Sequence, residues 1–241
     1  MACEFPRQGV KLDVVGQIDR IDFGTVESEA GERKSYFLVI DYKTGDEELS
    51  LQEVYYGVRL QLLTYLAAAR QFFLRRGKTA DMIPAGMLYC MLKNPVIAES
   101  GKISRTDAEN KLLEKLRMRG WLLNDANVIK SIDDAAKYIR IKLNKDKTDI
   151  DGRYKKNTKN EQEFDVLTAY ALKKLQDAGE HVLSGDIKIQ PFRTKKKSAC
   201  KYCPYRDVCG FEEKYHDVSK FNLDDAEILM AKMNEEQKGG V

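Results

Sequence analysis

The chain has 241 residues, of which 43% are hydrophobic and 33% are charged, with 41 Lys and Arg against 38 Asp and Glu. This composition can bury a sizeable core, and it excludes bulk disorder and a collagen-like repeat. No apolar run is long enough to cross a membrane, and the first residues lack the layout of a secretion signal, so we expect a soluble, cytoplasmic protein without membrane contact.

The first two elements are predicted to be paired strands. Residues 11–23 mix β-branched and polar residues in partial alternation, which indicates a strand with one buried face. A turn rich in Gly and Glu spans 27–34, and 35–45 then form a nearly continuous apolar strand that ends in Asp41, Lys43 and a glycine. Two strands joined by such a turn predict an antiparallel hairpin.

Helical and strand patterns alternate in the middle of the chain. Apolar residues recur at steps of three and four over 51–76, which predicts a helix closed by Gly77. The short apolar and aromatic run over 84–93 predicts a third core strand. Thr106 is then expected to cap a helix over 107–119.

In the second half, residues 133–144 predict a weaker helix, and the polar, lysine-rich 145–160 predict a surface loop. Asn160 is expected to cap a further helix that ends at Gly179. The remaining predicted elements are a short strand and a terminal helix, over 186–190 and 224–238. This order predicts an α/β fold with a small mixed central β-sheet flanked by helices, followed by a C-terminal cysteine-cluster segment.

We expect two regions, a core over 1–192 and a basic, cysteine-bearing segment with its tail over 193–241. Between Arg193 and Arg206 lie six basic residues and no acidic one. Such a run suits contact with phosphate groups, and it is equally typical of a solvated loop.

One charged pair ends the second predicted strand. Asp41 and Lys43 are two residues apart, so their side chains share a face, and hairpin pairing would bring Asp19 beside Asp41. Two neighbouring carboxylates repel each other, and Mg²⁺ relieves that repulsion with few protein ligands. A lysine beside such a metal can orient water or stabilise charge on a phosphate. The alternative is a surface Asp–Lys pair on a hairpin.

The following helix carries Gln61 and Tyr65, which are four residues apart and share one face. That spacing would place an amide and a phenol over the carboxylates of the strand. Such a pair is more often an ordinary packing pair, so the spacing alone leaves both interpretations open.

Three of the five cysteines lie close together, as Cys200-x2-Cys203-x5-Cys209. In a cytoplasmic protein this spacing favours a metal over a disulfide. With His216 as fourth ligand the set would suit structural zinc, which the spacing slightly favours, and with a fourth thiolate it would suit an iron–sulfur cluster. Cys90 lies inside a predicted strand and is interpreted as a buried apolar residue.

Three motifs together resemble the RecB-type PD-(D/E)XK nucleases, and most closely the C-terminal nuclease domain of AddB-type subunits of helicase–nuclease complexes. The motifs read GQIDRID over 16–22, VIDYKTG over 39–45 and YGVRLQLLTYL over 56–66, and the resemblance runs from about 13 to 211. The resemblance implies Mg²⁺ (or Mn²⁺), with a role for each matching residue. The implied metal ligands are Asp19, Asp41 and the backbone carbonyl of Tyr42; the implied catalytic residues also include Lys43, Gln61 and Tyr65.

The resemblance also reverses the preference for zinc. In these nucleases three C-terminal cysteines join one distant N-terminal cysteine around a structural [4Fe–4S] cluster, and here Cys3 is the upstream candidate. The family usually carries a further acidic or His residue on a helix before the first strand. Only 18 residues precede Asp19, so we expect that helix to be missing and the chain to be a C-terminal fragment whose cluster can be incomplete.

The implied function is a metal-dependent exonuclease that hydrolyses single-stranded DNA during double-strand break repair, with an AddA-like helicase–nuclease subunit as its partner. The chain has no glycine loop of the phosphate-binding type, so we expect no ATP hydrolysis in it. Two alternatives stay open: a non-catalytic DNA-binding scaffold stapled by a metal cluster, and a freestanding Cas4-like exonuclease.

Overall fold

The computed structural model describes residues 2–5, 10–27, 31–76, 82–98, 100–194, 197–221 and 224–238. Its strands are β1 (Ala2–Phe5), β2 (Val10–Asp13), β3 (Arg20–Glu27), β4 (Arg33–Lys43), β5 (Met82–Met91), β6 (Arg119–Leu123), β7 (Thr158–Lys159), β8 (Phe192–Arg193) and β9 (Ser219–Lys220). Its α-helices are α1 (Leu51–Tyr55), α2 (Gln61–Arg75), α3 (Arg105–Leu116), α4 (Ala126–Asp133), α5 (Glu161–Leu183), α6 (Arg206–Cys209) and α7 (Ala226–Lys238). Two 3₁₀ helices are η2 (Gly152–Asn157) and η3 (Ala199–Tyr202).

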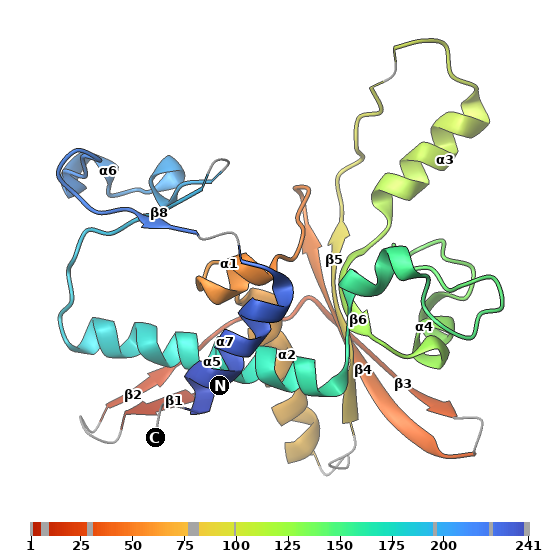
Figure 1. The fold of residues 1–241 in the computed structure, drawn as a ribbon, viewed down its shortest axis with the longest axis horizontal. Coiled ribbons are helices and arrows are strands. Elements are labelled where there is room, and N and C mark those ends of the chain that lie inside the picture. Colours follow the sequence, from red (N-terminus) through yellow and green to blue (C-terminus); the bar gives the residue numbers. More distant parts are fainter. Residues whose placement is uncertain are drawn as a thin grey trace.

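Five strands form the central sheet, in the order β3-β4-β5-β6-β7. The β3–β4 and β5–β6 pairs are antiparallel, whereas the β4–β5 and β6–β7 pairs are parallel. The sheet is therefore mixed and carries helices around it, as Figure 1 shows, which confirms the predicted fold class.

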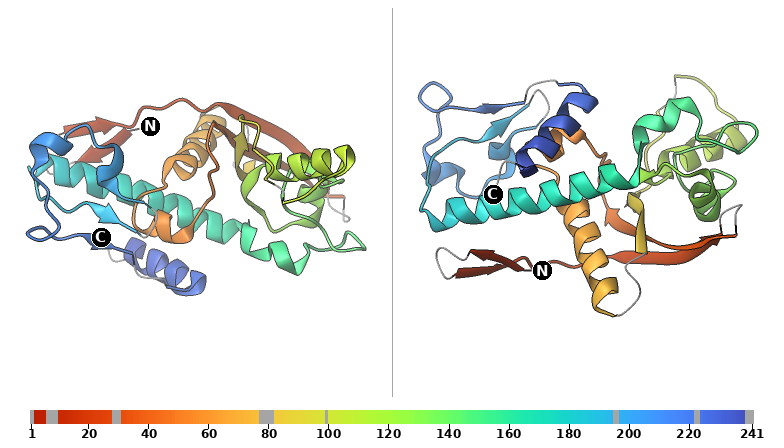
Figure 2. Two further views of the ribbon diagram at one scale, coloured as in Figure 1. Left: turned by 90° about the horizontal axis from the view of Figure 1, so that it is seen from above. Right: turned by 60° about the horizontal axis from the view of Figure 1, so that its bottom comes forward.

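Strand β4 lies in the middle of the core and is covered on both faces. On one face, the ring of Phe37 lies 5.4 Å from that of Phe73 of α2. On the other face, Leu38 lines a small hollow together with Val128 of α4. Helix α5 runs past α2 with α7 packed beside it (Figure 2). Because both faces are covered, the strand is apolar from Tyr36 to Ile40, directly before its polar end.

The remaining elements surround this core. Strands β1 and β2 form an antiparallel pair, and β8 and β9 form a parallel pair at the cysteine-bearing segment, at the upper left of Figure 1. Helix α3 stands away from the body and contains no buried residue. None of the helices in the described ranges combines the length and the apolarity that a membrane crossing needs.

The predicted hairpin is confirmed, with Arg20 opposite Ile40, but the single first strand over 11–23 is wrong. The chain leaves β2 at Asp13 and enters β3 only at Arg20. Between them, Gly16 passes so close to Tyr65 that a Cβ at this position would lie 3.2 Å from the ring. A contact with a distant helix, and not local pattern, therefore interrupts the strand.

The predicted helix over 51–76 is two helices, because Gly57 adopts a positive φ of 74° between α1 and α2. The expected cap at Gly77 lies outside the described residues. Helix α3 forms where it was expected, but its cap is Ser104 and not Thr106. The Ser104 hydroxyl accepts a hydrogen bond from the Asp107 amide at 3.1 Å.

The predicted helix over 133–144 is wrong, because helix α4 ends there. The Asp133 carboxylate accepts hydrogen bonds from the amides of Tyr138 and Ile139 at 2.6 and 3.0 Å, which fold the chain into a turn. The prediction of a surface loop over the lysine-rich 145–160 is also wrong, because this stretch contains η2 and the buried strand β7.

Strand β6, with its buried Trp121, was not predicted, because it is short and lies in a region whose pattern is mixed. The predicted strand over 186–190 is wrong as well, and the next strand, β8, starts at Phe192. Asn160 caps α5 as expected, through a reciprocal capping box with Glu163, but the helix continues past Gly179 to Leu183. The terminal helix is confirmed as α7.

Candidate active site

The polar end of β4 presents Asp41 and Lys43 on one face. Asp41 is only 2% exposed, although it carries a carboxylate. Lys43 Nζ lies 2.5 Å from Asp41 Oδ2. A buried carboxylate is stable only with a partner charge or ligand, so this burial already marks Asp41 as unusual.

Asp19 lies directly before β3, in line with the antiparallel pairing that joins this strand to β4. Its Oδ2 accepts a hydrogen bond from the backbone N–H of Tyr42 at 2.8 Å. The hairpin therefore brings Asp19 to the strand end that carries Asp41. The sequence-based expectation that the two residues approach each other agrees with this geometry.

Helix α2 brings Gln61 and Tyr65 to the same place. Lys43 Nζ donates to Gln61 Oε1 at 2.8 Å, and Gln61 Nε2 donates to the Tyr65 hydroxyl at 3.0 Å. A continuous line of contacts thus runs from Asp41 through Lys43 and Gln61 to Tyr65. The five side chains expected in the nuclease site, those of Asp19, Asp41, Lys43, Gln61 and Tyr65, thus come together where β4 ends and α2 begins.

The donor set fits a hard divalent cation. Asp41 Oδ2 is buried and accepts no hydrogen bond from the described residues, its ion pair with Lys43 lacking hydrogen-bond geometry. Asp19 adds a second carboxylate beside it. Oxygen ligands of this kind suit Mg²⁺ and Mn²⁺, which take a few carboxylates and complete their shell with water and substrate.

The ring of Tyr89 on β5 lies beneath this site, with its centroid 5.7 Å from Lys43 Nζ. Burial raises the pKa of Tyr89, and the nearby cations Arg59 and Lys43 only partly offset that effect. Tyr89 is therefore a neutral phenol under the lysine at physiological pH.

Arg59 takes part in this neighbourhood, and sequence reasoning gave it no role. Its guanidinium forms ion pairs with Glu47 and Glu53, and its side chain is only 15% exposed. Burial by itself lowers the pKa of Arg59, but the hydrogen bonds to Glu53 and Glu47 raise it by more, so the net shift is upward. The signal available in the sequence was a charged residue inside the otherwise apolar motif that leads to Gln61.

The cysteine segment gives a mixed result. Cys200, Cys203 and Cys209 are half-buried free thiols that line one hollow of about 370 Å³. Within the described residues no three side chains of ligating type are close enough to hold a metal ion. His216 does not line this hollow, and the side chain of Cys3 lies outside the described part of the chain.

A larger hollow, of about 1250 Å³, lies elsewhere. It is bounded by Leu38 and Ile40, on the opposite face of β4, and by residues of α3. None of the five site residues lines it, so hollow size is a poor guide to the chemistry here. Its lining includes Cys90, which is half-buried on β5.

A mixed sheet that ends a buried strand in Asp-x-Lys, beside a second carboxylate and under a Gln- and Tyr-bearing helix, has the core of a nuclease domain. The chain belongs to the PD-(D/E)XK nuclease superfamily, whose family model matches residues 1–210. That match includes every residue of the site at β4 and α2.

Longer bacterial proteins, each named as the B-type subunit of an ATP-dependent helicase/deoxyribonuclease, are similar to the chain. One from Bacillus mycoides is 35% identical over 245 residues, which cover 96% of this chain and 20% of the relative. Another from Thermoanaerobacter sp. is 37% identical over 211 residues, which cover 86% of this chain and 18% of the relative. The chain spans about a fifth of the length of these relatives.

Proposed function

We propose that this chain is a metal-dependent deoxyribonuclease domain that hydrolyses phosphodiester bonds. The observation that carries the proposal is the buried Asp41 carboxylate, paired with Lys43 at the strand end where Asp19 accepts a hydrogen bond from the Tyr42 amide. Burying a charge is costly, and two carboxylates beside a lysine suit a metal and a phosphate.

In this proposal Asp19, Asp41 and the backbone carbonyl of Tyr42 hold the cation. Mg²⁺ or Mn²⁺, when bound there, supplies the positive charge that activates water and neutralises the phosphate. Lys43 is fixed by Asp41 on one side and Gln61 on the other, at 2.5 and 2.8 Å. Its ammonium is thereby held ready for the negative charge that develops on the phosphate during attack.

Gln61 and Tyr65 hold the scissile strand in place. Their mutual hydrogen bond orients both polar groups along one side of α2, beside Lys43. Positioning of this kind lowers the barrier because the reacting groups meet in a fixed geometry.

The names of the relatives support a wider proposal. We infer that the substrate is single-stranded DNA and that an AddA-like helicase–nuclease subunit supplies it. The hydrolysis would take place during double-strand break repair. The relatives are named as helicase and deoxyribonuclease subunits, and this chain corresponds to a fifth of their length.

We also propose that Cys200, Cys203 and Cys209 are ligands of a structural [4Fe–4S] cluster, with Cys3 as the upstream ligand and zinc as the alternative metal. Support comes from the hollow that the three thiols share, whose lining also includes the cationic side chains of Arg193, Lys201 and Arg206. Three cysteines that line one hollow would supply three of the four ligands that such a cluster or a structural zinc takes.

The first test is degradation of end-labelled single-stranded DNA by the chain with Mg²⁺ or Mn²⁺. Asp41→Ala and Lys43→Ala are each expected to reduce cleavage by about 10²-fold or more, because each removes charge from the reacting centre. Lys43→Ala should leave the dissociation constant for DNA largely unchanged. Asp165→Ala, which changes a surface carboxylate of α5, is the matched control and should cleave normally.

Two outcomes would contradict the proposal. A wild-type chain that binds DNA without cutting it, with either metal, would favour the non-catalytic scaffold. Equal loss of cleavage and of binding in Lys43→Ala would make Lys43 a phosphate contact only. Processive degradation by the chain without any partner would instead favour the freestanding Cas4-like exonuclease.

A further inference from the structure

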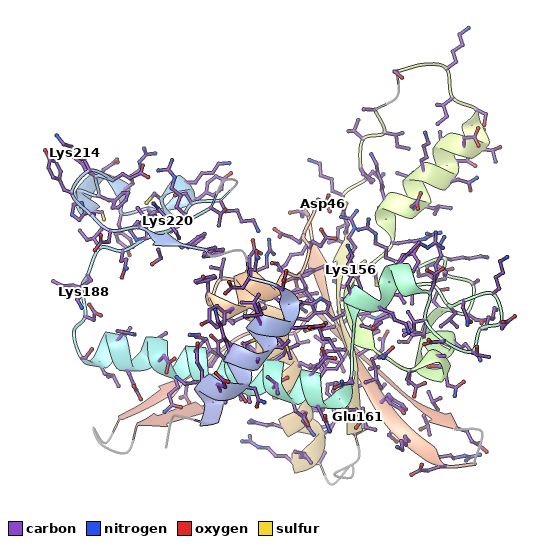
Figure 3. The ribbon with its side chains drawn as sticks, viewed as in Figure 1. Asp46, Lys156, Glu161, Lys188, Lys214 and Lys220 are labelled. Atoms are coloured by element: carbon purple, nitrogen blue, oxygen red, sulfur yellow. The ribbon has the colours of Figure 1, made fainter. Side chains whose placement is uncertain are left out.

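Arg59 joins the two segments that meet at the candidate site. Glu47 lies four residues after Lys43, on the loop that leaves β4, and Arg59 lies two residues before Gln61, at the entry to α2. The ion pair between Arg59 and Glu47 thus joins the same two segments as the hydrogen bond between Lys43 and Gln61. Figure 3 labels the neighbouring Asp46, which lies on the same loop.

A second carboxylate completes the clamp. Glu53 of α1 pairs with Arg59 Nε, while its backbone carbonyl accepts hydrogen bonds from the amides of Val58 and Arg59 at 2.8 and 3.3 Å. The side chains of Arg59 and Glu53 are 15% and 14% exposed, so this pair is largely shielded from solvent. Shielded, two-sided contacts to a guanidinium hold geometry better than surface ion pairs do.

Helix α2 needs such an anchor because its own start is weak. Its cap residue is Leu60, which has no side-chain hydrogen bond to the first turn. The turn before it contains Gly57 in a positive-φ conformation, which adds backbone freedom. The position of Gln61, the first residue of the helix, therefore depends on contacts made just before it.

We propose that Arg59 is a positioning residue of the nuclease site: clamped by Glu47 and Glu53, it seats the first turn of α2 so that Gln61 meets Lys43. Arg59 acts through Gln61 and does not itself touch the substrate. This inference rests on the proposed function for its catalytic part, whereas the seating of α2 can be measured without any cleavage.

The catalytic arm is a double-mutant cycle in the 241-residue chain. Arg59→Gln is expected to lower the single-turnover cleavage rate by about 10²-fold, since a misplacement of about 1 Å costs that much, with little change in DNA affinity. In a Gln61→Leu background, Arg59→Gln should lower the cleavage rate hardly any further, because Gln61 no longer links Arg59 to Lys43. Arg59→Lys keeps the charge without the two-sided fork and should recover only part of the rate.

The structural arm is hydrogen exchange at the amides of Val58, Arg59 and Thr64, which are hydrogen-bonded to the carbonyls of Glu53 and Leu60. Arg59→Gln should speed exchange there, and Arg70→Gln, which removes a surface arginine from the same helix, should not. Unchanged exchange in Arg59→Gln would overturn the seating of α2. Additive losses of cleavage rate in the double-mutant cycle would overturn the link between Arg59 and Lys43. A wild-type chain that cuts no DNA would refute the proposed function, and the exchange rates would still decide whether Arg59 seats α2.

Discussion

Lys43 is held from two sides, by a neighbour on its own strand and by a residue of a helix. Asp41 on β4 is 2.5 Å away, and Gln61 on α2 is 2.8 Å away. A long, flexible lysine normally loses considerable side-chain entropy when it is fixed in one position. Here that cost is met by two polar partners before any substrate arrives.

A different lysine, Lys159, is buried at a place that has no part in the candidate site. Lys159 of β7 donates to the Thr158 carbonyl at 3.0 Å, and its ammonium lies 3.8 Å from Glu163. Burial lowers its pKa from the ordinary 10.5, and Glu163 opposes this effect only in part. The unfolded chain therefore holds this proton more tightly than the folded chain does.

The pH dependence of stability follows from that difference. Below pH 10.5 the unfolded chain binds the Lys159 proton more tightly, which lowers the free energy of unfolding. This loss of stability disappears as the pH rises from the lowered pKa of the folded chain to above 10.5. Relative to Lys159→Met, the wild-type chain should therefore gain unfolding free energy as the pH rises through that window. Denaturant titrations of both proteins at several pH values measure the difference, and a difference that does not change with pH would contradict the prediction.

At the scale of elements, sequence patterns predict what local interactions dictate. The continuous apolar run of β4 and the Asn160 cap of α5 both carry their signal within a few residues, and both form as expected. Strand β7 could not be found this way, because Thr158 and Lys159 are polar and become a strand only by pairing with Leu122 and Leu123 of β6.

The same distinction between local signals and tertiary contacts applies to the candidate site. Spacing predicts that Asp41 and Lys43 share a face of one strand and that Gln61 and Tyr65 share a face of one helix, whereas their roles in a site were implied by the resemblance of the motifs. The contact of Arg59 with Glu47 and Glu53 has no comparable periodic signal, because it crosses two turns. Contacts of this kind depend on the tertiary fold and can be read only from the structure.

The cap of α5 has a measurable effect. The Asn160 side chain accepts a hydrogen bond from the Glu163 amide at 2.8 Å, and the Glu163 carboxylate accepts one from the Asn160 amide at 2.8 Å. Asn160→Ala should lower the unfolding free energy by about 1 kcal/mol, because one helix-end donor loses its partner. Urea unfolding measures this loss, and Asn160→Asp, which keeps an acceptor, should be nearly neutral; equal losses in both variants would contradict the capping role.

At the scale of the whole molecule, the cysteine segment is joined to the core by a contact of long sequence separation. Lys197 lies three residues before Cys200, and its Nζ donates to Glu53 Oε1 at 2.6 Å across 144 residues of chain. Glu53 also pairs with Arg59. One carboxylate thus connects the segment that carries the thiols to the turn that precedes α2.

The metal proposal for this segment is tested by composition. The chain purified without oxygen should contain iron and sulfide and should absorb visible light, and Cys203→Ser should lose both signals. Cys90→Ser, which changes a half-buried thiol of β5, should retain them. Stoichiometric zinc in place of iron would support the alternative metal, and a chain that holds neither metal would contradict the assignment of these thiols as ligands.

The hydrogen bond between Asp19 and residue 42 uses the main chain, since the donor is the Tyr42 amide. Every amino acid except proline carries that donor. The contact with Asp19 therefore depends on the main chain at the middle position of the Asp-x-Lys tripeptide, whereas the half-buried Tyr42 side chain packs against the core. Proline is the one residue that would remove this contact.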